Sequence, residues 1–176
     1  MATDVIDVIT VDNRVEEEKI EPVLQEFTEE QESGSVLLNC PDYGENYANL
    51  KIPSIGVDLP IYYGKTLDLL KKGIGHDNDS YFPGEGGSIV LMGHNFSRFL
   101  AKLPNVKVGD TIQITTNYGE FNYRVYNAQI VNENDTYKVP IQENEEIVMI
   151  YTCWPINNIG YATDRYVVYA KYKEIV

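Results

Sequence analysis

The sequence predicts a mainly β domain, either a closed barrel or a two-sheet sandwich. Three observations lead to this fold class: six or more short runs of β-forming residues follow residue 49, turn residues separate them, and only two short segments have a helical pattern. Strands and helices do not alternate regularly, which argues against a parallel α/β sheet. With 176 residues, the chain is long enough for one such domain and a short appendage.

The first two predicted strands carry prolines, which suit strand ends and edges because proline cannot donate a hydrogen bond to a sheet. These strands lie at residues 52–57 and 59–63, and Gly56 is expected to mark a bulge. Residues 66–73 then predict a short helix, since a threonine begins this segment as N-cap and a glycine ends it.

The middle of the chain predicts a loop, a buried strand and a helical turn. Residues 83–87 contain three glycines but not the lysine of a phosphate loop, so they predict a turn. Residues 88–93 carry the apolar run of a buried strand. Residues 97–103, closed by Pro104, are a candidate helical turn.

The second half of the chain predicts a hairpin and two further strands. Residues 111–116 and 120–131 flank Asn117-Tyr118-Gly119, whose glycine is available for a positive φ. Strands at residues 146–152 and 165–173 complete the set.

Charge divides the chain into two parts. The whole chain holds 14 Lys and Arg against 27 Asp and Glu, a formal net charge of -13. Residues 1–48 hold thirteen of the acids and two of the bases, whereas residues 49–176 hold fourteen acids and twelve bases. We therefore predict an acidic N-terminal arm or linker over residues 1–48 and a nearly neutral folded domain over residues 49–176.

The acidic charge argues against nucleic acid as a partner, because it repels phosphate backbones. No run approaches the roughly 20 apolar residues that span a bilayer, and acids stand where a signal peptide would have basic residues. The chain is therefore expected either to be cytosolic or to be a piece that lacks its targeting segment. Its two cysteines are too few for a disulfide framework.

Three chemically active side chains stand where predicted strands begin or end. Cys153 follows an apolar run and precedes Trp154-Pro155, so it lies at a strand mouth, where a half-exposed thiolate is a competent nucleophile. His94 follows the strand at residues 88–93, and Arg165 begins the last strand. A buried core cysteine is the commoner explanation of Cys153 alone, but a barrel can bring such strand ends together.

Several motifs resemble the sortase family of cysteine transpeptidases. They stand in the order that sortases show: Gly93-His94-Asn95, Tyr151-Thr152-Cys153-Trp154-Pro155, and residues 159–168 around Arg165. Residues 50–61, 73–76 and 83–88 also look like sortase, so the resemblance covers roughly residues 49–173. It implies an eight-stranded β-barrel with one or two short helices.

The resemblance also implies roles for four residues. Cys153 would attack a threonine carbonyl in a C-terminal sorting signal of Leu-Pro-x-Thr-Gly type, forming a thioacyl enzyme that an amine of the cell wall resolves. His94 would serve as general acid and base, and Arg165 would hold the substrate and stabilise the oxyanion. Thr152 would line the same site. No cofactor or metal is implied, and a monomer is expected at the outer face of the membrane, anchored by a segment outside this chain.

Departures from the family pattern bear on the subclass. The usual Thr-Leu-x-Thr-Cys is Met149-Ile150-Tyr151-Thr152-Cys153 here, and Asn95 replaces the common Arg after Gly-His. The arm lacks the Asp-Pro-aromatic lid motif of pilin-polymerising sortases, and residues 131–146 are too few for the long helix of class B. A class D-like enzyme is therefore preferred. The acids of the arm are also expected to fold across the site and partly neutralise Arg165.

Other candidate residues have simpler explanations. His76 is expected to be structural, with the general-acid role as its alternative, and Cys40 is interpreted as an incidental thiol in the arm. For one group of acids a solvated rim is preferred over a calcium site, because a spaced ligand loop is missing: Glu133, Asp135, Glu143, Glu145 and Glu146. The fourteen tyrosines are expected to pack the barrel.

Three other functions stay open at this point. The first is a cysteine peptidase that only hydrolyses the signal, although papain-like enzymes usually place Cys before His, and here His94 precedes Cys153. The second is a pilin-polymerising sortase. The third is a catalytically idle barrel that only binds peptide.

Overall fold

The computed structural model describes residues 40–135 and 141–173, which form eight strands and three short helices. The strands are β1 (Asn46–Ile52), β2 (Val57–Tyr63), β3 (Ile74–His76), β4 (Ser88–Met92), β5 (Thr111–Thr116), β6 (Glu120–Asn132), β7 (Ile147–Trp154) and β8 (Asp164–Tyr172). The helices are the 3-10 helix η1 (Pro53–Ile55), the α-helix α1 (Leu67–Leu70) and the 3-10 helix η2 (Leu103–Asn105).

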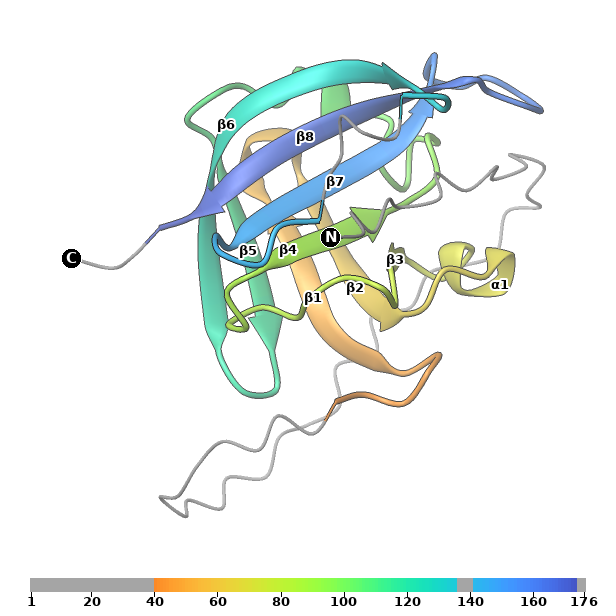
Figure 1. The fold of residues 1–176 in the computed structure, drawn as a ribbon. Coiled ribbons are helices and arrows are strands. Elements are labelled where there is room, and N and C mark those ends of the chain that lie inside the picture. Colours follow the sequence, from red (N-terminus) through yellow and green to blue (C-terminus); the bar gives the residue numbers. More distant parts are fainter. Residues whose placement is uncertain (1–39, 136–140, 174–176) are drawn as a thin grey trace, which may run out of the picture.

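The eight strands close into one barrel (Figure 1). Their order is β1-β2-β3-β4-β7-β8-β6-β5, and pairing of β1 with β5 completes the circle. The predicted β-barrel is therefore confirmed, and the sandwich alternative is wrong. Most neighbours are antiparallel, but β2–β3 and β4–β7 are parallel. The parallel β4–β7 pair brings the C-terminal ends of these two strands to the same edge of the barrel.

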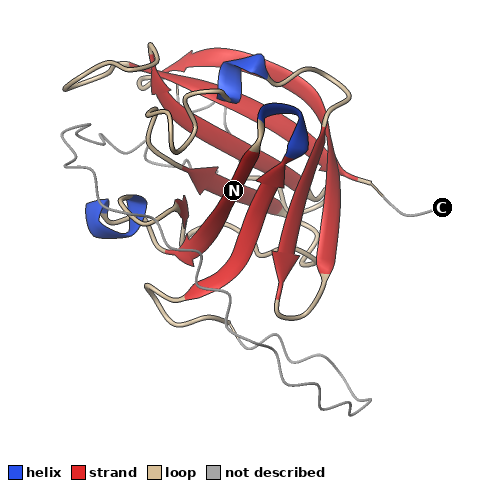
Figure 2. Cartoon of the chain, turned by 180° about the vertical axis from the view of Figure 1, so that it is seen from behind, coloured by secondary structure: helices blue, strands red, loops and turns tan. Residues whose placement is uncertain are grey.

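The short helices lie at the edges of the barrel (Figure 2). Helix α1 forms inside the predicted segment 66–73 but covers only Leu67–Leu70, and the Thr66 hydroxyl caps it as predicted by accepting a hydrogen bond from Leu69 N–H at 3.4 Å. The predicted helical turn at residues 97–103 is a series of turns, and regular 3-10 structure begins only at Leu103. Pro104 lies inside η2 instead of ending it, since proline fits the first positions of a helix.

Two glycines differ from their predictions. The expected bulge at Gly56 is wrong: Gly56 ends η1 with φ of 69°, a left-handed conformation that turns the chain from β1 into β2. Gly119 does not use the positive φ for which it is available. The Thr116 hydroxyl closes that hairpin turn by accepting hydrogen bonds from the N–H groups of Tyr118 and Gly119, at 3.2 and 3.0 Å.

Apolar side chains pack on both faces of β4, β7 and β8. One cluster draws residues from all eight strands and fills the barrel, with Leu91 and Ile150 among them. A second cluster lies on the opposite face of this part of the sheet and includes Met149, Tyr151 and Cys153. Every position of β4 is buried, which explains its continuous apolar run. Cys153 therefore belongs to the outer face of the barrel and not to its interior.

The first strand begins at Asn46, before residue 49 where the sequence divides arm from domain. Most of the predicted arm, residues 1–39, lies outside the described residues. Within the described ranges, the structure has no helix with the length and apolar character needed to cross a bilayer.

Candidate active site

Cys153 and Arg165 lie directly opposite each other on neighbouring strands. Cys153 is on β7, Arg165 is on β8, and the antiparallel register pairs the two residues. Side chains of paired residues project from the same face, with Cβ atoms roughly 4.5–5.5 Å apart. Both residues are buried, Cys153 with 3% and Arg165 with 2% of its surface exposed, so the expectation of a half-exposed thiol at the strand mouth is wrong. The β7–β8 pairing thus places a cation beside the thiol.

Backbone carbonyls orient the guanidinium of Arg165. Its Nη1 donates hydrogen bonds to the carbonyl oxygens of Ala162 at 2.5 Å and of Asp164 at 2.8 Å. These acceptors are neutral, so they orient the group without cancelling its positive charge. A fixed cation in a buried site is suited to stabilise a developing oxyanion.

His94 follows β4 at the level where β7 reaches Cys153. The last paired residues of these parallel strands are Met92 and Tyr151, so the residues two positions farther along, His94 and Cys153, lie at the same level. The Gly93 N–H continues the connection by donating to the Tyr151 carbonyl oxygen at 3.2 Å. The His94 imidazole therefore lies at the same edge of the barrel as the Cys153 thiol.

Close packing fixes the backbone around His94. A side chain at Gly93 would have its Cβ 2.9 Å from Ile74 Cδ1, closer than real Cβ atoms approach, and 3.0 Å from Leu100 Cδ1, tighter than most real contacts. The Leu100 N–H donates to the His94 carbonyl oxygen at 2.9 Å. Glycine at this position lets the chain pass close to the Ile74 side chain of β3, and a larger residue would force the side chains of Ile74 and Leu100 to shift.

Burial sets the protonation state of His94. The residue is 1% exposed, and this burial lowers the pKa of its imidazole to about 4, with the positive charge of Lys71 acting in the same direction. The ring packs near Phe96 and Phe99. Among the described residues neither ring nitrogen has a hydrogen-bond partner. A neutral imidazole with both nitrogens unused can exchange a proton with a thiol or an amine.

Thr152 connects the two parallel strands. Its hydroxyl donates a hydrogen bond to the Gly93 carbonyl oxygen at 2.8 Å, and the residue is buried. Because neighbouring strand residues project to opposite faces, this hydroxyl lies on the other face of β7 from the Cys153 thiol. The predicted contact of Thr152 with substrate stays a prediction, and in the structure its hydroxyl holds β7 to the residue before His94.

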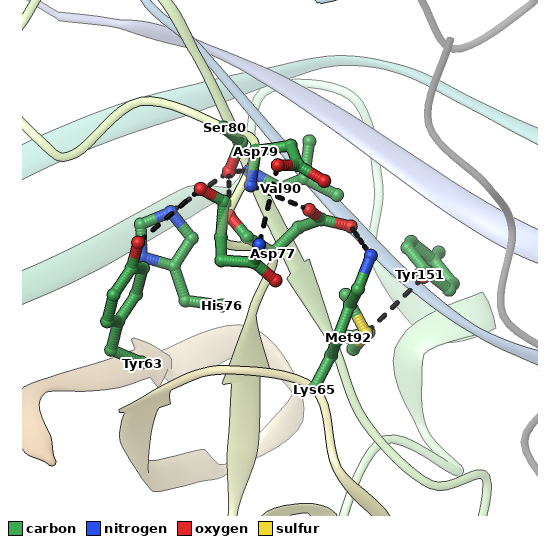
Figure 3. A network of polar contacts seen from close by, with 10 residues as sticks. Tyr63, Lys65, His76, Asp77, Asp79, Ser80, Val90, Met92 and Tyr151 are labelled. Carbon is green, nitrogen blue, oxygen red and sulfur yellow. Dashed lines mark hydrogen bonds and ion pairs between the residues drawn. The ribbon is translucent and has the colours of Figure 1, made fainter. Parts of the chain in front are cut away.

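His76 is part of a satisfied hydrogen-bond network (Figure 3). Its Nδ1 lies 2.8 Å from the Tyr47 hydroxyl, and its Nε2 lies 2.9 Å from Ser80 Oγ and 3.0 Å from the Tyr81 carbonyl oxygen. Because a carbonyl oxygen only accepts, Nε2 carries the proton and Nδ1 accepts from Tyr47. Burial lowers the pKa of His76 to about 4. Both nitrogens are engaged, which supports the structural interpretation over the general-acid alternative.

The residue after His76 forms a partly buried ion pair that the sequence did not reveal. Asp77 is fully buried, and its Oδ2 lies 3.3 Å from Lys65 Nζ (Figure 3). Its Oδ1 accepts a hydrogen bond from the Asp79 N–H at 3.0 Å, and its own N–H donates to the Val90 carbonyl oxygen at 2.9 Å. These contacts attach the loop after β3 to β4.

The acids considered as a rim or a calcium site lie in separate places. Glu145 forms an exposed ion pair with Lys171 at 2.7 Å, and the Glu133 carboxylate accepts a hydrogen bond from the Tyr161 hydroxyl. In the part of the chain that the structure describes, no three His, Cys, Asp or Glu side chains converge as metal ligands.

Glu146 departs from the predicted solvated rim. Its carboxylate accepts hydrogen bonds from the N–H groups of Gly84 and Gly86, each at 3.1 Å, and from the Tyr123 hydroxyl at 2.6 Å. It therefore fixes the glycine-rich loop before β4 to the start of β7. No local sequence signal could have shown this, because the partners come from two segments that are distant from Glu146 in the sequence.

Asn95 is a site residue to which the sequence assigned no role. It is fully buried, and its Nδ2 donates to the carbonyl oxygens of Cys153 at 3.3 Å and of Pro155 at 3.0 Å. The available signal was its place beside His94, where it departs from the family's common Arg.

Comparison with known proteins agrees with the barrel fold. The chain matches the family described as "Sortase domain" over residues 50–173. It is 38% identical over 131 residues to Sortase D of Bacillus subtilis (strain 168), an alignment that covers 74% of this chain and 66% of that protein. The chain thus spans slightly less than two thirds of the length of this relative.

Solved structures extend the similarity to the whole barrel. A Clostridium perfringens Sortase D5 transpeptidase is 32% identical with a TM-score of 0.66, covering 75% of this chain and 81% of that one. A lid mutant of Sortase A from Corynebacterium diphtheriae is 28% identical with a TM-score of 0.68, covering 75% and 72%. The near-equal TM-scores show that the fold alone does not separate sortase classes. By its domain match, its barrel and its sequence identity, the chain belongs to the sortase family.

Proposed function

We propose that this chain carries the catalytic domain of a cysteine transpeptidase that cuts a sorting signal of Leu-Pro-x-Thr-Gly type and transfers the released protein to an amine of the cell wall. One observation carries the proposal: Cys153 faces Arg165 across the β7–β8 pair, at the level where His94 follows β4. A thiol, a guanidinium and an imidazole at one buried edge supply a nucleophile, an oxyanion ligand and a proton carrier.

The first half of the reaction forms the thioacyl enzyme. His94 is neutral at pH 7 because its pKa is about 4, so the proton it later donates comes from the Cys153 thiol. Sγ attacks the threonine carbonyl carbon, and Arg165 stabilises the negative charge that develops on the carbonyl oxygen. The C–N bond then breaks, the imidazolium of His94 protonates the leaving amine, and a thioester remains on Cys153.

The second half releases the product. An incoming amine attacks the thioester carbon and gives up a proton to His94. The C–S bond breaks, and the Cys153 thiolate recovers that proton, so the enzyme returns to its starting state. Water in place of the amine gives hydrolysis by the same steps.

Family membership supports the substrate and the setting that we propose. The partners we propose are the sorting-signal peptide of a surface protein and a cell-wall precursor amine, at the outer face of the membrane. The identities of 38% and 32% to a Sortase D and a Sortase D5 support a class D-like enzyme.

Intact-mass measurement with a Leu-Pro-x-Thr-Gly peptide tests this function. Without an amine, the wild-type protein is expected to gain the mass of the acyl fragment, and with an amine it is expected to yield the ligated peptide. The Cys153→Ala variant is expected to show neither. Cys40→Ala is the matched control, since Cys40 is the exposed cysteine, and it is expected to retain both activities.

The remaining outcomes separate the alternatives. Hydrolysis without ligation favours the peptidase, and ligation restricted to lysine side-chain amines favours a pilin-polymerising enzyme. The absence of any adduct on wild-type Cys153 favours a barrel that only binds peptide. Ligation by Cys153→Ala equal to wild type contradicts the proposed mechanism.

A further inference from the structure

Asn95 is a buried polar side chain that the proposed reaction leaves unexplained. It has no exposed surface, it follows His94, and it lies in the bend where the chain leaves β4. Its amide reaches across to the end of β7, where it contacts the backbone of Cys153 and Pro155.

The Asn95 side chain takes the place of a missing backbone hydrogen bond. In a parallel pair the N–H groups of alternate residues bond evenly spaced carbonyl oxygens of the neighbouring strand. The Gly93 N–H donates to the Tyr151 carbonyl oxygen, so the next bond of the series would join the N–H of residue 95 to the Cys153 carbonyl oxygen. The chain bends away from β7 there, and Asn95 Nδ2 donates to that carbonyl oxygen at 3.3 Å.

The orientation of this amide is determined by its partners. Both partners of Nδ2 are carbonyl oxygens, which only accept, so Nδ2 faces them and Oδ1 points elsewhere. Oδ1 is buried and has no hydrogen-bond partner within residues 40–135 and 141–173. A buried acceptor without a partner opposes folding, so the benefit of this amide lies in what its donor group holds in place.

We propose that Asn95 is a positioning residue for the nucleophile. By holding the carbonyl groups of Cys153 and Pro155, it fixes the backbone from which the thiol projects toward His94 and Arg165. On one side, β7 pairs with β8 at Cys153 through Arg165. On the opposite side, where β4 has ended, the Asn95 amide contacts the Cys153 backbone instead. This inference rests on the proposed role of Cys153 as nucleophile.

A matched pair of variants tests this inference in a Cys40→Ala background, where Cys153 is the one remaining cysteine. Asn95→Ala removes the amide at the site. Asn46→Ala removes a comparable amide elsewhere, since Asn46 Nδ2 donates to the carbonyl oxygens of Ala48 at 3.1 Å and Ile61 at 3.0 Å. Asn95→Gln keeps the amide on a longer side chain and serves if the alanine variant does not fold.

Two measurements are made on each variant. The first is the pH profile of Cys153 alkylation by iodoacetamide, which needs no substrate. The second is kcat and KM for ligation of the signal peptide. A displacement on the order of 1 Å in an active site can lower a rate about 100-fold, so Asn95→Ala is expected to lower kcat roughly 10- to 100-fold and leave KM nearly unchanged.

The alkylation profile separates positioning from plain stabilisation. A thiol displaced from the Arg165 cation and the His94 imidazole loses stabilisation of its thiolate form. The pH midpoint of Cys153 alkylation is therefore expected to rise in Asn95→Ala. It is expected to rise less in Asn95→Gln and to stay at the wild-type value in Asn46→Ala. The inference is overturned if Asn95→Ala and Asn46→Ala have the same alkylation profile and the same kcat. If Asn95→Ala is unfolded, the inference is overturned when Asn95→Gln matches wild type in both measurements. If wild type ligates nothing, the proposed function fails, and the alkylation profiles still decide the role of Asn95.

Discussion

At the scale of single residues, the site combines the Cys153 thiol with the Arg165 guanidinium, which is oriented by backbone groups of β8 and of the loop before it. Arg165 is buried, and the carbonyl oxygens of Ala162 and Asp164 orient its guanidinium. Both contacts come from Nη1, so the planar guanidinium fork keeps further N–H groups on its other two nitrogens. Lysine has the same charge but no such fork.

Arg165→Lys is therefore expected to lower kcat/KM by about 100-fold or more, a loss on the order of that seen when one oxyanion donor is removed. The measurement is steady-state ligation of the signal peptide, with Arg124→Lys as control, since Arg124 is exposed on β6. Equal kcat/KM for the two variants would show that charge alone suffices at position 165.

At the scale of elements, the parallel β4–β7 pair has the proposed reactive side chains at one end and a loop-binding carboxylate at the other. His94 and Cys153 lie at the C-terminal ends of the two strands, and Glu146 lies at their N-terminal ends. There the Glu146 carboxylate binds the glycine-rich loop and the Tyr123 hydroxyl. Burial and this hydrogen bond both raise the pKa of Tyr123, so its hydroxyl stays a donor.

Glu146→Gln is expected to reduce the free energy of unfolding by about 1–3 kcal/mol, because an amide cannot replace both carboxylate oxygens as acceptors. Urea unfolding measures this loss, and kcat of the folded fraction is expected to stay unchanged. The control is Glu145→Gln, which removes an exposed ion pair with Lys171 and is expected to cost at most about 1 kcal/mol. A lower kcat in Glu146→Gln would show that the N-terminal ends of β4 and β7 also affect the reaction at their C-terminal ends.

At the scale of the whole molecule, two buried histidines make folding sensitive to acid. His76 and His94 both have a pKa of about 4 in the folded protein, against about 6.5 in an unfolded chain. Between these values the unfolded state binds more protons than the folded state. The free energy of unfolding that the two neutral histidines contribute is therefore fully present above about pH 6.5 and is lost as the pH falls toward 4.

Urea unfolding across this pH window is expected to show a slope approaching about 1.4 kcal/mol per pH unit for each histidine. Replacing His94 by Gln is expected to remove roughly half of that slope, since one of two contributing groups is lost. A slope in His94→Gln equal to that of wild type would show that His94 is not held neutral by burial.

The acidic arm gives a second prediction at this scale. Residues 1–39, which hold eleven acids and two bases, lie outside the described residues, and their removal leaves β1 whole. If their charge partly neutralises Arg165, truncation is expected to raise kcat/KM at low ionic strength. The difference is expected to shrink near 0.1 M salt, where charges are screened over about 10 Å. Equal rates at low salt would eliminate this role of the arm.

Local signals in the sequence predicted most strands, the capped helix α1 and the positions of Cys153, His94 and Arg165 at strand ends. These features depend on residues close together in the chain: apolar runs, a threonine cap, and glycine and proline at the turns. The sortase motifs added the eight-stranded barrel. The errors were also local, as at Gly56, where a proline before the glycine started a 3-10 helix in place of a bulge.

By itself, the sequence thus determined the fold class and the family, and it predicted which side chains react. The tertiary structure alone decided which groups meet: the register that pairs Cys153 with Arg165, the Asn95 amide at the end of β7, and the Glu146 carboxylate under the glycine-rich loop. The physical reason is that these contacts join segments about 10 to 60 residues apart, and their geometry depends on strand order and register, which short-range propensities do not encode.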